Sequence, residues 1–334
     1  MSAELRARLT SVPSVELPLG DEVERALEAT LTWLSSDAAM SQLRADPYWP
    51  KWHGPWWRML TLHELGHADC IPRKMIEGMV EVLAALPVHV FPIRDEDWPD
   101  GADRRRDALC HCAVGCIDQV LSACGVDVDQ ELPWMTSWFA RHQLSDGGYN
   151  CDEGAYLLAN ECASSMVGTV APLEAMIRRG PSEPCDRAAA MLIGRRLIEG
   201  SPSVYNASER EAARTWAKPC FPRFYFYDVL RGAAVLARWA VAHQRPLPRR
   251  AIEPAVEQLL AHSADGVVLI GRVAWRGKTT LVSDDGWRDR HLAQPSELLE
   301  LCGRVGEPNR ALSAQWARLR SDLIELLDAG LLVP

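Results

Sequence analysis

Two groups of residues in this sequence have types and spacing that could do chemistry. The first is His63-Glu64-Leu65-Gly66-His67, an H-E-x-x-H string. On a helix this spacing puts two imidazoles on one face for zinc and places the glutamate as a general base, as in zinc peptidases. Gly66 and the following Pro72, however, predict that the helix ends inside the string. A zinc hydrolase is therefore an alternative rather than our leading hypothesis.

The second group comes from segments that are far apart in the chain. Ten cysteines in a large chain without a secretory signal favour buried thiols, metal ligands or a nucleophile over disulfides. Thiolate, imidazole and carboxylate groups all bind zinc, and a catalytic zinc keeps one position open. We therefore predict a zinc site formed by Cys162, Cys151, Asp152 and His111. The alternative is that these cysteines are small core residues.

An acid behind aromatic residues is the candidate for proton transfer. Asp228 follows Tyr225, Phe226 and Tyr227 at the predicted start of an apolar helix. A desolvated carboxylate there would hold its proton more tightly, as a general acid requires. We predict catalytic roles for Asp228, Tyr225 and Tyr227. The alternative is that the acid stabilises the first turn of the helix while the rings fill the core.

Three further residues are predicted to contact a substrate: Arg106, Trp56 and Tyr149. Arg106 ends a short run of arginines just before an apolar helix, which suits an anionic group. Trp56 belongs to a tryptophan-rich stretch near the first apolar helix, and aromatic side chains suit an apolar or cationic ligand. A solvated arginine face and ordinary aromatic packing are the alternatives.

The elements that must position these residues are helices, because the apolar spacing is helical almost throughout. Apolar helices predicted to start near residues 54, 107, 162, 225 and 295 alternate with amphipathic helices at 72–86, 133–143, 185–200, 251–263 and 313–329. Glycines 66, 125, 180 and 306 suit left-handed caps after four of the apolar members. An apolar helix must be buried and an amphipathic one lies outside it. We predict an all-α double ring of about five inner and outer hairpins over residues 51–334, capped by residues 1–50.

Several motifs resemble a known superfamily. Phe139-x3-Gln143 followed by Asp146-Gly147-Gly148-Tyr149 resembles the Q-x-x-D-G-G-W repeat of squalene and terpene cyclases and of protein prenyltransferase β subunits. The stretches 147–166 and 224–236 are similar to the D-x-C and F-Y-H segments of the prenyltransferases. The resemblance implies an α/α toroid and a central apolar cavity. It covers the architecture of residues 50–330 but only about 60 residues in motif.

The family's functional residues are only partly present. The resemblance implies zinc ligands at Asn160, Cys162 and Tyr225 or Phe226, and of these only the cysteine matches the family pattern. The basic residues expected before D-x-C for a diphosphate are absent, since residues 156–159 are Tyr-Leu-Leu-Ala. The D-x-D-D motif of class II terpene cyclases is also missing.

Composition narrows the classes of partner. The net charge of −9 disfavours nucleic acid, which requires a basic face. No apolar run approaches the length of a membrane span, and the first residues lack the apolar core of a secretory signal. We expect a cytoplasmic monomer or homodimer.

Together these observations predict a divergent member of the superfamily. The leading hypothesis is an enzyme with a zinc or thiol centre that acts on a small apolar or isoprenoid-like substrate in the ring. The alternatives are a non-catalytic toroid that binds an apolar ligand or a protein partner, and the H-E-x-x-H zinc hydrolase.

Overall fold

The computed structural model describes residues 2–284 and 287–334, and this part of the chain is mostly helical, which confirms the predicted all-α class. The α-helices are α1 (Ser2–Ser11), α2 (Asp21–Leu34), α3 (Asp37–Ala45), α4 (Pro55–Glu64), α5 (Arg73–Ala84), α6 (His111–Ala123), α7 (Val128–Glu131), α8 (Pro133–His142), α9 (Met166–Ile177), α10 (Glu183–Gly194), α11 (Ala207–Ala213), α12 (Val229–His243), α13 (Arg249–His262), α14 (Glu297–Cys302) and α15 (Arg310–Asp328). Short 3₁₀ turns are η1 (Ala68–Cys70), η2 (Asp95–Asp97) and η3 (Glu153–Leu157).

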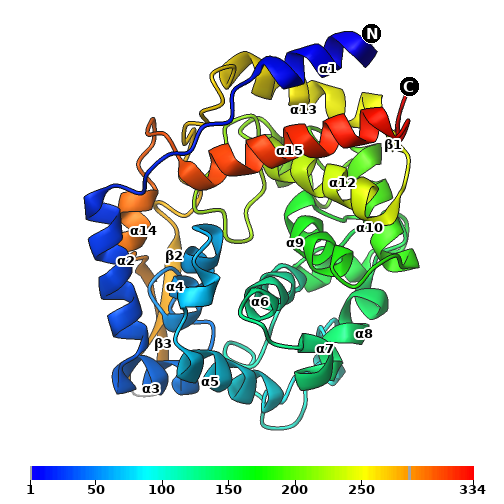
Figure 1. Cartoon of the computed structure of the whole chain (residues 1–334). Coiled ribbons are helices and arrows are strands. Elements are labelled where there is room, and N and C mark those ends of the chain that lie inside the picture. The colour runs from blue at the N-terminus through cyan, green and yellow to red at the C-terminus, as the bar shows by residue number, and fades with distance from the viewer. Residues whose placement is uncertain (1, 285–286) are drawn as a thin grey trace.

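Inner and outer helices alternate along much of the chain, as the apolar spacing predicts. Helix α4 packs against α6, α6 against α9, and α9 against α12, while α10 and α13 contact this inner row from outside. Figure 1 shows α4 and α6 in the interior, with α5, α7, α8 and α10 at the periphery. Ten of the twelve residues of α9 are buried, so this helix is surrounded by protein on all sides.

The predicted helix ends are accurate, but the starts are not. The four glycines expected as caps, Gly66, Gly125, Gly180 and Gly306, all have positive φ, between 83° and 89°. Three inner helices, in contrast, begin four residues later than expected, at 111, 166 and 229 instead of 107, 162 and 225. The candidate residues just before these starts therefore lie on non-helical segments that lead into the helices.

The last hairpin departs from the prediction. Helix α14, expected as an inner helix, has six residues and packs against α2, whereas α15, expected outside, packs along the inner helix α12. The N-terminal helices fill the remaining positions, with α2 against α4 and α14, and α1 against α15. The first 45 residues are thus tied to both ends of the helical array.

Two inner helices, α6 and α9, cross closely at Gly115. A Cβ atom there would lie 2.5 Å from the carbonyl carbon of Ala171 and 2.6 Å from the nitrogen of Pro172 in α9. Only glycine allows this separation without moving a backbone. The crossing fixes α6, whose N-terminal end carries two cysteines, relative to α9.

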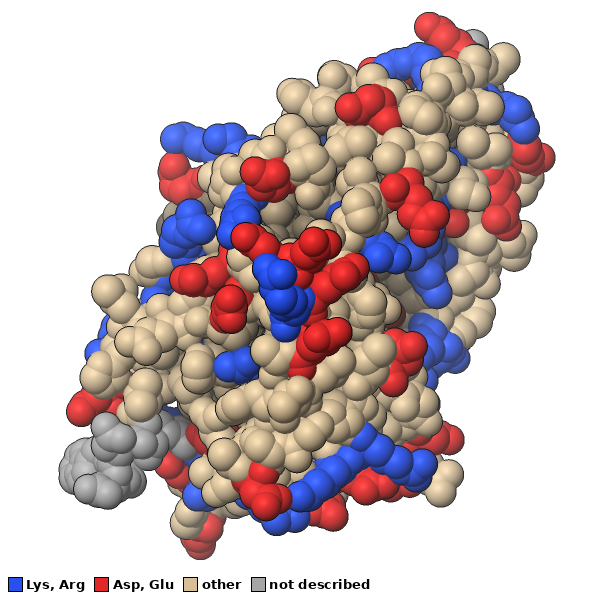
Figure 2. All heavy atoms as spheres, turned by 60° about the vertical axis from the view of Figure 1, so that its left-hand side comes forward, with Lys and Arg blue, Asp and Glu red and all other residues tan. Residues whose placement is uncertain are grey.

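Strands are short in the described part of the chain. β1 (Leu247–Pro248) pairs in parallel with β4 (Leu332–Val333), and β2 (Thr279–Asp284) forms an antiparallel hairpin with β3 (Trp287–Leu292). Basic and acidic side chains are interspersed over the face in Figure 2. None of the described helices combines the length and the apolar character that a membrane span requires.

Candidate metal centre

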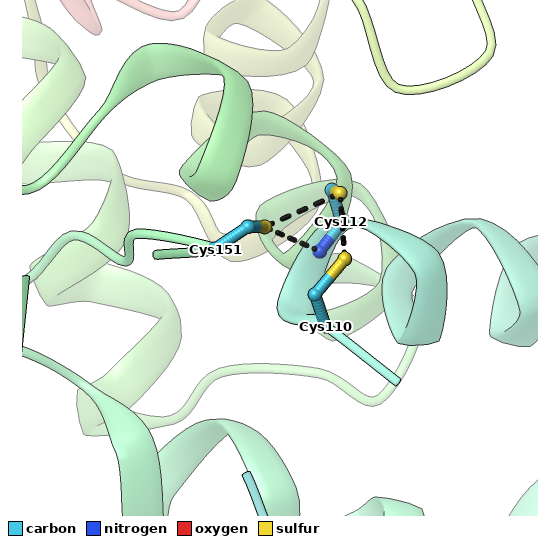
Figure 3. A group of neighbouring side chains, drawn as sticks. All are labelled: Cys110, Cys112 and Cys151. Atoms are coloured by element: carbon cyan, nitrogen blue, oxygen red, sulfur yellow. Dashed lines mark hydrogen bonds between the residues drawn. The ribbon is translucent and has the colours of Figure 1, made fainter. Parts of the chain in front are cut away.

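Three cysteine side chains converge at the start of α6. Cys110 is the N-cap residue of α6, Cys112 lies in its first turn, and Cys151 comes from the loop between α8 and η3. The Sγ of Cys112 is 3.2 Å from that of Cys110 and 3.2 Å from that of Cys151, and all three sulfurs lie within 4.8 Å of one another. Figure 3 shows the side chains pointing toward one another from the helix end and the loop. We call these residues the three-cysteine cluster.

The loop that carries Cys151 is held by the Q-x-x-D-G-G-Y motif. The side-chain amide of Gln143 donates to the carbonyls of Gly147 and Pro184, both at 2.8 Å, which ties the end of α8 to the start of α10. Gly147 has a φ of 90°, and a side chain there would collide with the backbone of Arg187. The motif is therefore a structural brace that delivers the 149–152 segment to the helix terminus.

The three thiols are not equivalent. Hydrogen bonds from the Cys112 and Cys151 thiols lower the pKa of Cys110 well below its ordinary value, and its place at the start of α6 also favours the thiolate. The Cys110 thiolate in turn raises the pKa of Cys112 and Cys151. The environment of the cluster therefore favours the thiolate at Cys110 over the other two sulfurs, and a bound metal would favour the thiolate form of all three.

The donor set fits zinc. Two sulfur ligands at about 2.3 Å on a tetrahedral zinc are roughly 3.8 Å apart. The 3.2 Å separations need only a small outward rotation of the side chains to reach this value. Three sulfurs leave a fourth position for water or a substrate, which is the ligand count of a catalytic site.

Only one of the four predicted metal ligands belongs to the cluster, namely Cys151. Cys162 and Asp152 are outside it, and Asp152 accepts a hydrogen bond from the backbone of Gly154 as the cap of η3. The predicted ligand set lacked Cys110 and Cys112, although the C-x-C spacing of these two residues directly before an apolar helix is a signal that could have found them.

His111, the fourth predicted ligand, is engaged on both ring nitrogens. Its Nδ1 accepts a hydrogen bond from Trp138 at 2.9 Å, and its Nε2 lies 2.8 Å from the hydroxyl of Tyr156. Because Trp138 can only donate, the neutral ring carries its proton on Nε2. His111 is fully buried, and it locks the first turn of α6 to α8 and η3.

The predicted acid Asp228 is a structural anchor in this arrangement. It caps α12 by accepting from the backbone of Arg231 at 2.9 Å, and its other oxygen accepts from the backbone of Cys220 at 3.0 Å. The Nε of Arg223 lies 3.1 Å from the same carboxylate, which is fully buried. These contacts join the 220–228 loop to the start of α12.

The two tyrosines beside Asp228 differ. The hydroxyl of Tyr227 donates to the carbonyl of Leu197 at 2.8 Å, and its ring is buried. Tyr225 is only partly buried, and both burial and the three thiols raise its pKa well above the ordinary value. Tyr225 therefore lies within the electrostatic influence of the three-cysteine cluster, whereas the hydroxyl of Tyr227 fastens the loop to Leu197.

The predicted substrate contacts are occupied by other interactions. Arg106 forms a two-point ion pair with Asp107, at 2.6 and 2.9 Å. Trp56 is buried in the core, and Tyr149 is buried with its hydroxyl donating to the carbonyl of Phe139 at 3.0 Å.

The H-E-x-x-H string does not form a metal-binding helix face. Helix α4 ends at Glu64, and His67 lies beyond the Gly66 turn, with its backbone donating to Leu62. Glu64 accepts hydrogen bonds from the backbones of Arg223 and Phe224, at 2.6 and 2.5 Å. Glu64 therefore fixes the loop before α12, which is a structural role at the end of a helix.

Fold and site together define an all-helical protein with a three-cysteine cluster among its inner helices. No protein-family model matches the sequence, and no curated protein is similar to it. Among solved structures, a variant of a type II terpene cyclase from Scytonema, in complex with geranylgeranyl dihydroxybenzoate, matches at 11% identity and a TM-score of 0.27. The match covers 92% of this chain and 98% of that chain. At this TM-score the likeness carries no argument about function.

Proposed function

We propose that this protein is an enzyme with a zinc centre on Cys110, Cys112 and Cys151, acting on a small apolar or isoprenoid-like substrate. The observation that supports the proposal is the convergence of three sulfurs from two separate segments. Zinc held by three thiolates would activate a nucleophile at the open fourth position.

The surroundings of the cluster supply the other parts of a site. Cys110 and Cys151 keep partial solvent exposure, as do Tyr225 and Phe226 on the facing loop. The two aromatic rings lie 4.6 Å apart, so they present a continuous apolar face. Such a face suits the hydrocarbon part of a substrate next to a polar centre.

The test is the metal content of natively purified protein, with matched cysteine variants. We expect about one zinc per chain in the wild type and in Cys162→Ser, and loss of zinc in Cys110→Ser, Cys112→Ser and Cys151→Ser. Cys162→Ser is the matched control because Cys162 is also partly buried but is not in the cluster. Zinc that persists in Cys112→Ser, or a wild-type protein without metal, would contradict the proposal.

The second candidate function is a non-catalytic protein that binds an apolar ligand. It is favoured by the packing of Trp57 against Phe224 and Tyr225, at ring distances of 5.2 and 6.1 Å, which fills the space between α4 and the loop before α12. Apolar ligand binding by metal-free protein, unchanged in Cys112→Ser, would support this candidate.

A further inference from the structure

A lysine side chain lies among aromatic rings on the segment between α3 and α4. The Nζ of Lys51 is 4.9 Å from the ring centre of Trp49, 5.2 Å from those of Tyr48 and Tyr225, and 5.8 Å from that of Trp52. Its nearest polar partner is the hydroxyl of Tyr225 at 3.5 Å. Ring faces stabilise an ammonium group, but they do not neutralise its charge.

Within the described ranges 2–284 and 287–334, Lys51 forms no ion pair with a carboxylate. The charged groups with the largest effect on its pKa are the three-cysteine cluster and Lys278. Burial lowers the pKa of Lys51, and the thiols partly oppose this effect. A mostly buried ammonium is costly unless negative groups compensate its charge. The thiols supply part of this compensation, and an anionic ligand beside Lys51 would add to it.

The backbone around Lys51 is held in place. The N–H of Lys51 donates to the hydroxyl of Thr280 at 2.7 Å, and the indole of Trp49 donates to the carbonyl of Arg105 at 2.9 Å. Trp52 has a φ of 64°, a left-handed conformation that a tryptophan adopts only when its surroundings enforce it. The surrounding contacts therefore fix the segment that carries the ammonium.

The side chain is also within reach of a ligand. Lys51, Tyr225 and Phe226 are each only partly buried, as are Cys110 and Cys151. These residues come from four segments, and the thiols act electrostatically on both Lys51 and Tyr225. The ammonium, the phenol and the apolar ring face therefore border the same region as the cluster.

The charge available at this point matches a singly charged group. Arg104 is paired with Asp95 at 2.7 Å, and Arg106 is paired with Asp107. Lys278 is the other ammonium group that acts on Lys51, but only Lys51 lies beside the hydroxyl of Tyr225. One ammonium and one phenol at this point suit a carboxylate, whereas a diphosphate would need several cations in contact with it.

We propose that Lys51 binds the carboxylate of an amphiphilic substrate whose apolar part lies along Tyr225 and Phe226. The hydroxyl of Tyr225 supplies a second donor to the same carboxylate. This inference rests on the proposed function, because it names an apolar carboxylic acid as the substrate class of the same site. The binding step itself requires only the residues named here.

The experiment compares geranate with geraniol, which share an apolar chain and differ in the carboxylate. Binding is measured by tryptophan fluorescence on reduced, metal-free protein, so that the result does not depend on zinc. We expect geranate to bind at least tenfold more tightly than geraniol to the wild type, and Lys51→Met to remove this preference. Lys51→Arg should retain most of it, and Lys278→Met is the matched control with the preference intact.

A second measurement uses only the wild-type protein. Geranate, but not geraniol, should slow reductive methylation of Lys51 several-fold, as followed by peptide mass spectrometry. Equal binding of the two ligands, a preference that survives in Lys51→Met, or no protection of Lys51 would each overturn the inference. If the natively purified wild type contains no zinc but the protein still prefers geranate over geraniol, the result contradicts the proposed metal centre and leaves the carboxylate inference standing.

Discussion

The close crossing of α6 and α9 gives a sharp test of how the site is positioned. Gly115 lies within α6, and a Cβ there would meet three backbone atoms of α9 at 2.5 to 2.7 Å. Ordinary contacts begin near 3.4 Å, so the helices must separate by roughly 0.8 Å in Gly115→Ala. Backbone atoms cannot swing aside as a flexible side chain does.

The expected loss of stability follows from two opposing effects. Overpacking of a rigid contact costs up to about 3 kcal/mol. Alanine gains about 1 kcal/mol over glycine in a helix interior. We therefore expect Gly115→Ala to lower the free energy of unfolding by about 2 kcal/mol. Because α6 carries Cys110 and Cys112, the same displacement should also reduce zinc retention.

The assay is urea unfolding followed by circular dichroism, with Gly194→Ala as the matched control. Gly194 is exposed at the end of α10, and a Cβ there has no neighbour within 4 Å. This control should be stabilised by about 0.5 to 1 kcal/mol. If Gly115→Ala unfolds at the same or a higher urea concentration than the wild type, with an unchanged slope, the argument for the crossing is refuted.

Two further substitutions test buried polar groups. The buried guanidinium of Arg231 donates to both oxygens of Glu174, at 2.9 and 2.6 Å, and to the carbonyls of Phe224 and Phe226. Arg231→Met should lower the free energy of unfolding by about 3 kcal/mol in thermal unfolding, because Glu174 loses its charged partner and, within the described part of the chain, keeps only the hydrogen bond from Gln119. A change under about 1 kcal/mol would contradict this. Burial lowers the pKa of His142 to about 4 in the folded protein. Its contribution to the free energy of unfolding is therefore complete above the pKa of about 6.5 in the unfolded chain, and it is lost as the pH falls towards 4. Between pH 7.5 and 5 the free energy of unfolding of the wild type should fall by about 1 to 2 kcal/mol more than that of His142→Gln. If the two proteins show parallel profiles of stability against pH, the buried neutral His142 does not cause this pH dependence.

The helical pattern was predictable because it depends on local rules. The apolar spacing predicts the buried character of α9, and the glycines at 66, 125, 180 and 306 predict the helix ends through their positive φ. The starts were misplaced because the residues before α6, α9 and α12 continue the apolar character without being helical. Hydrophobic spacing does not distinguish a buried extended segment from a helix turn.

The candidate site shows the same limit. Sequence reasoning placed Cys151 in a metal site but paired it with His111, Asp152 and Cys162. Rotation about α6 and the path of the 149–152 loop decide which side chains meet, and they turn His111 towards Trp138 and bring Cys110 and Cys112 to Cys151. A few ångströms of displacement, invisible in residue spacing, change the ligand set.

The helical class, the alternation of apolar and amphipathic helices, and the presence of thiols near helix starts can be predicted without a structure, because each follows from residue type and short-range periodicity. The tertiary structure alone decided the use of Glu64, Asp228 and Lys51. The first two are tied to loop backbone, and the third is placed among aromatic rings beside the three-cysteine cluster. These contacts join residues from distant parts of the chain, and a chain's own periodicity carries no information about which distant segment will come within a hydrogen bond of it.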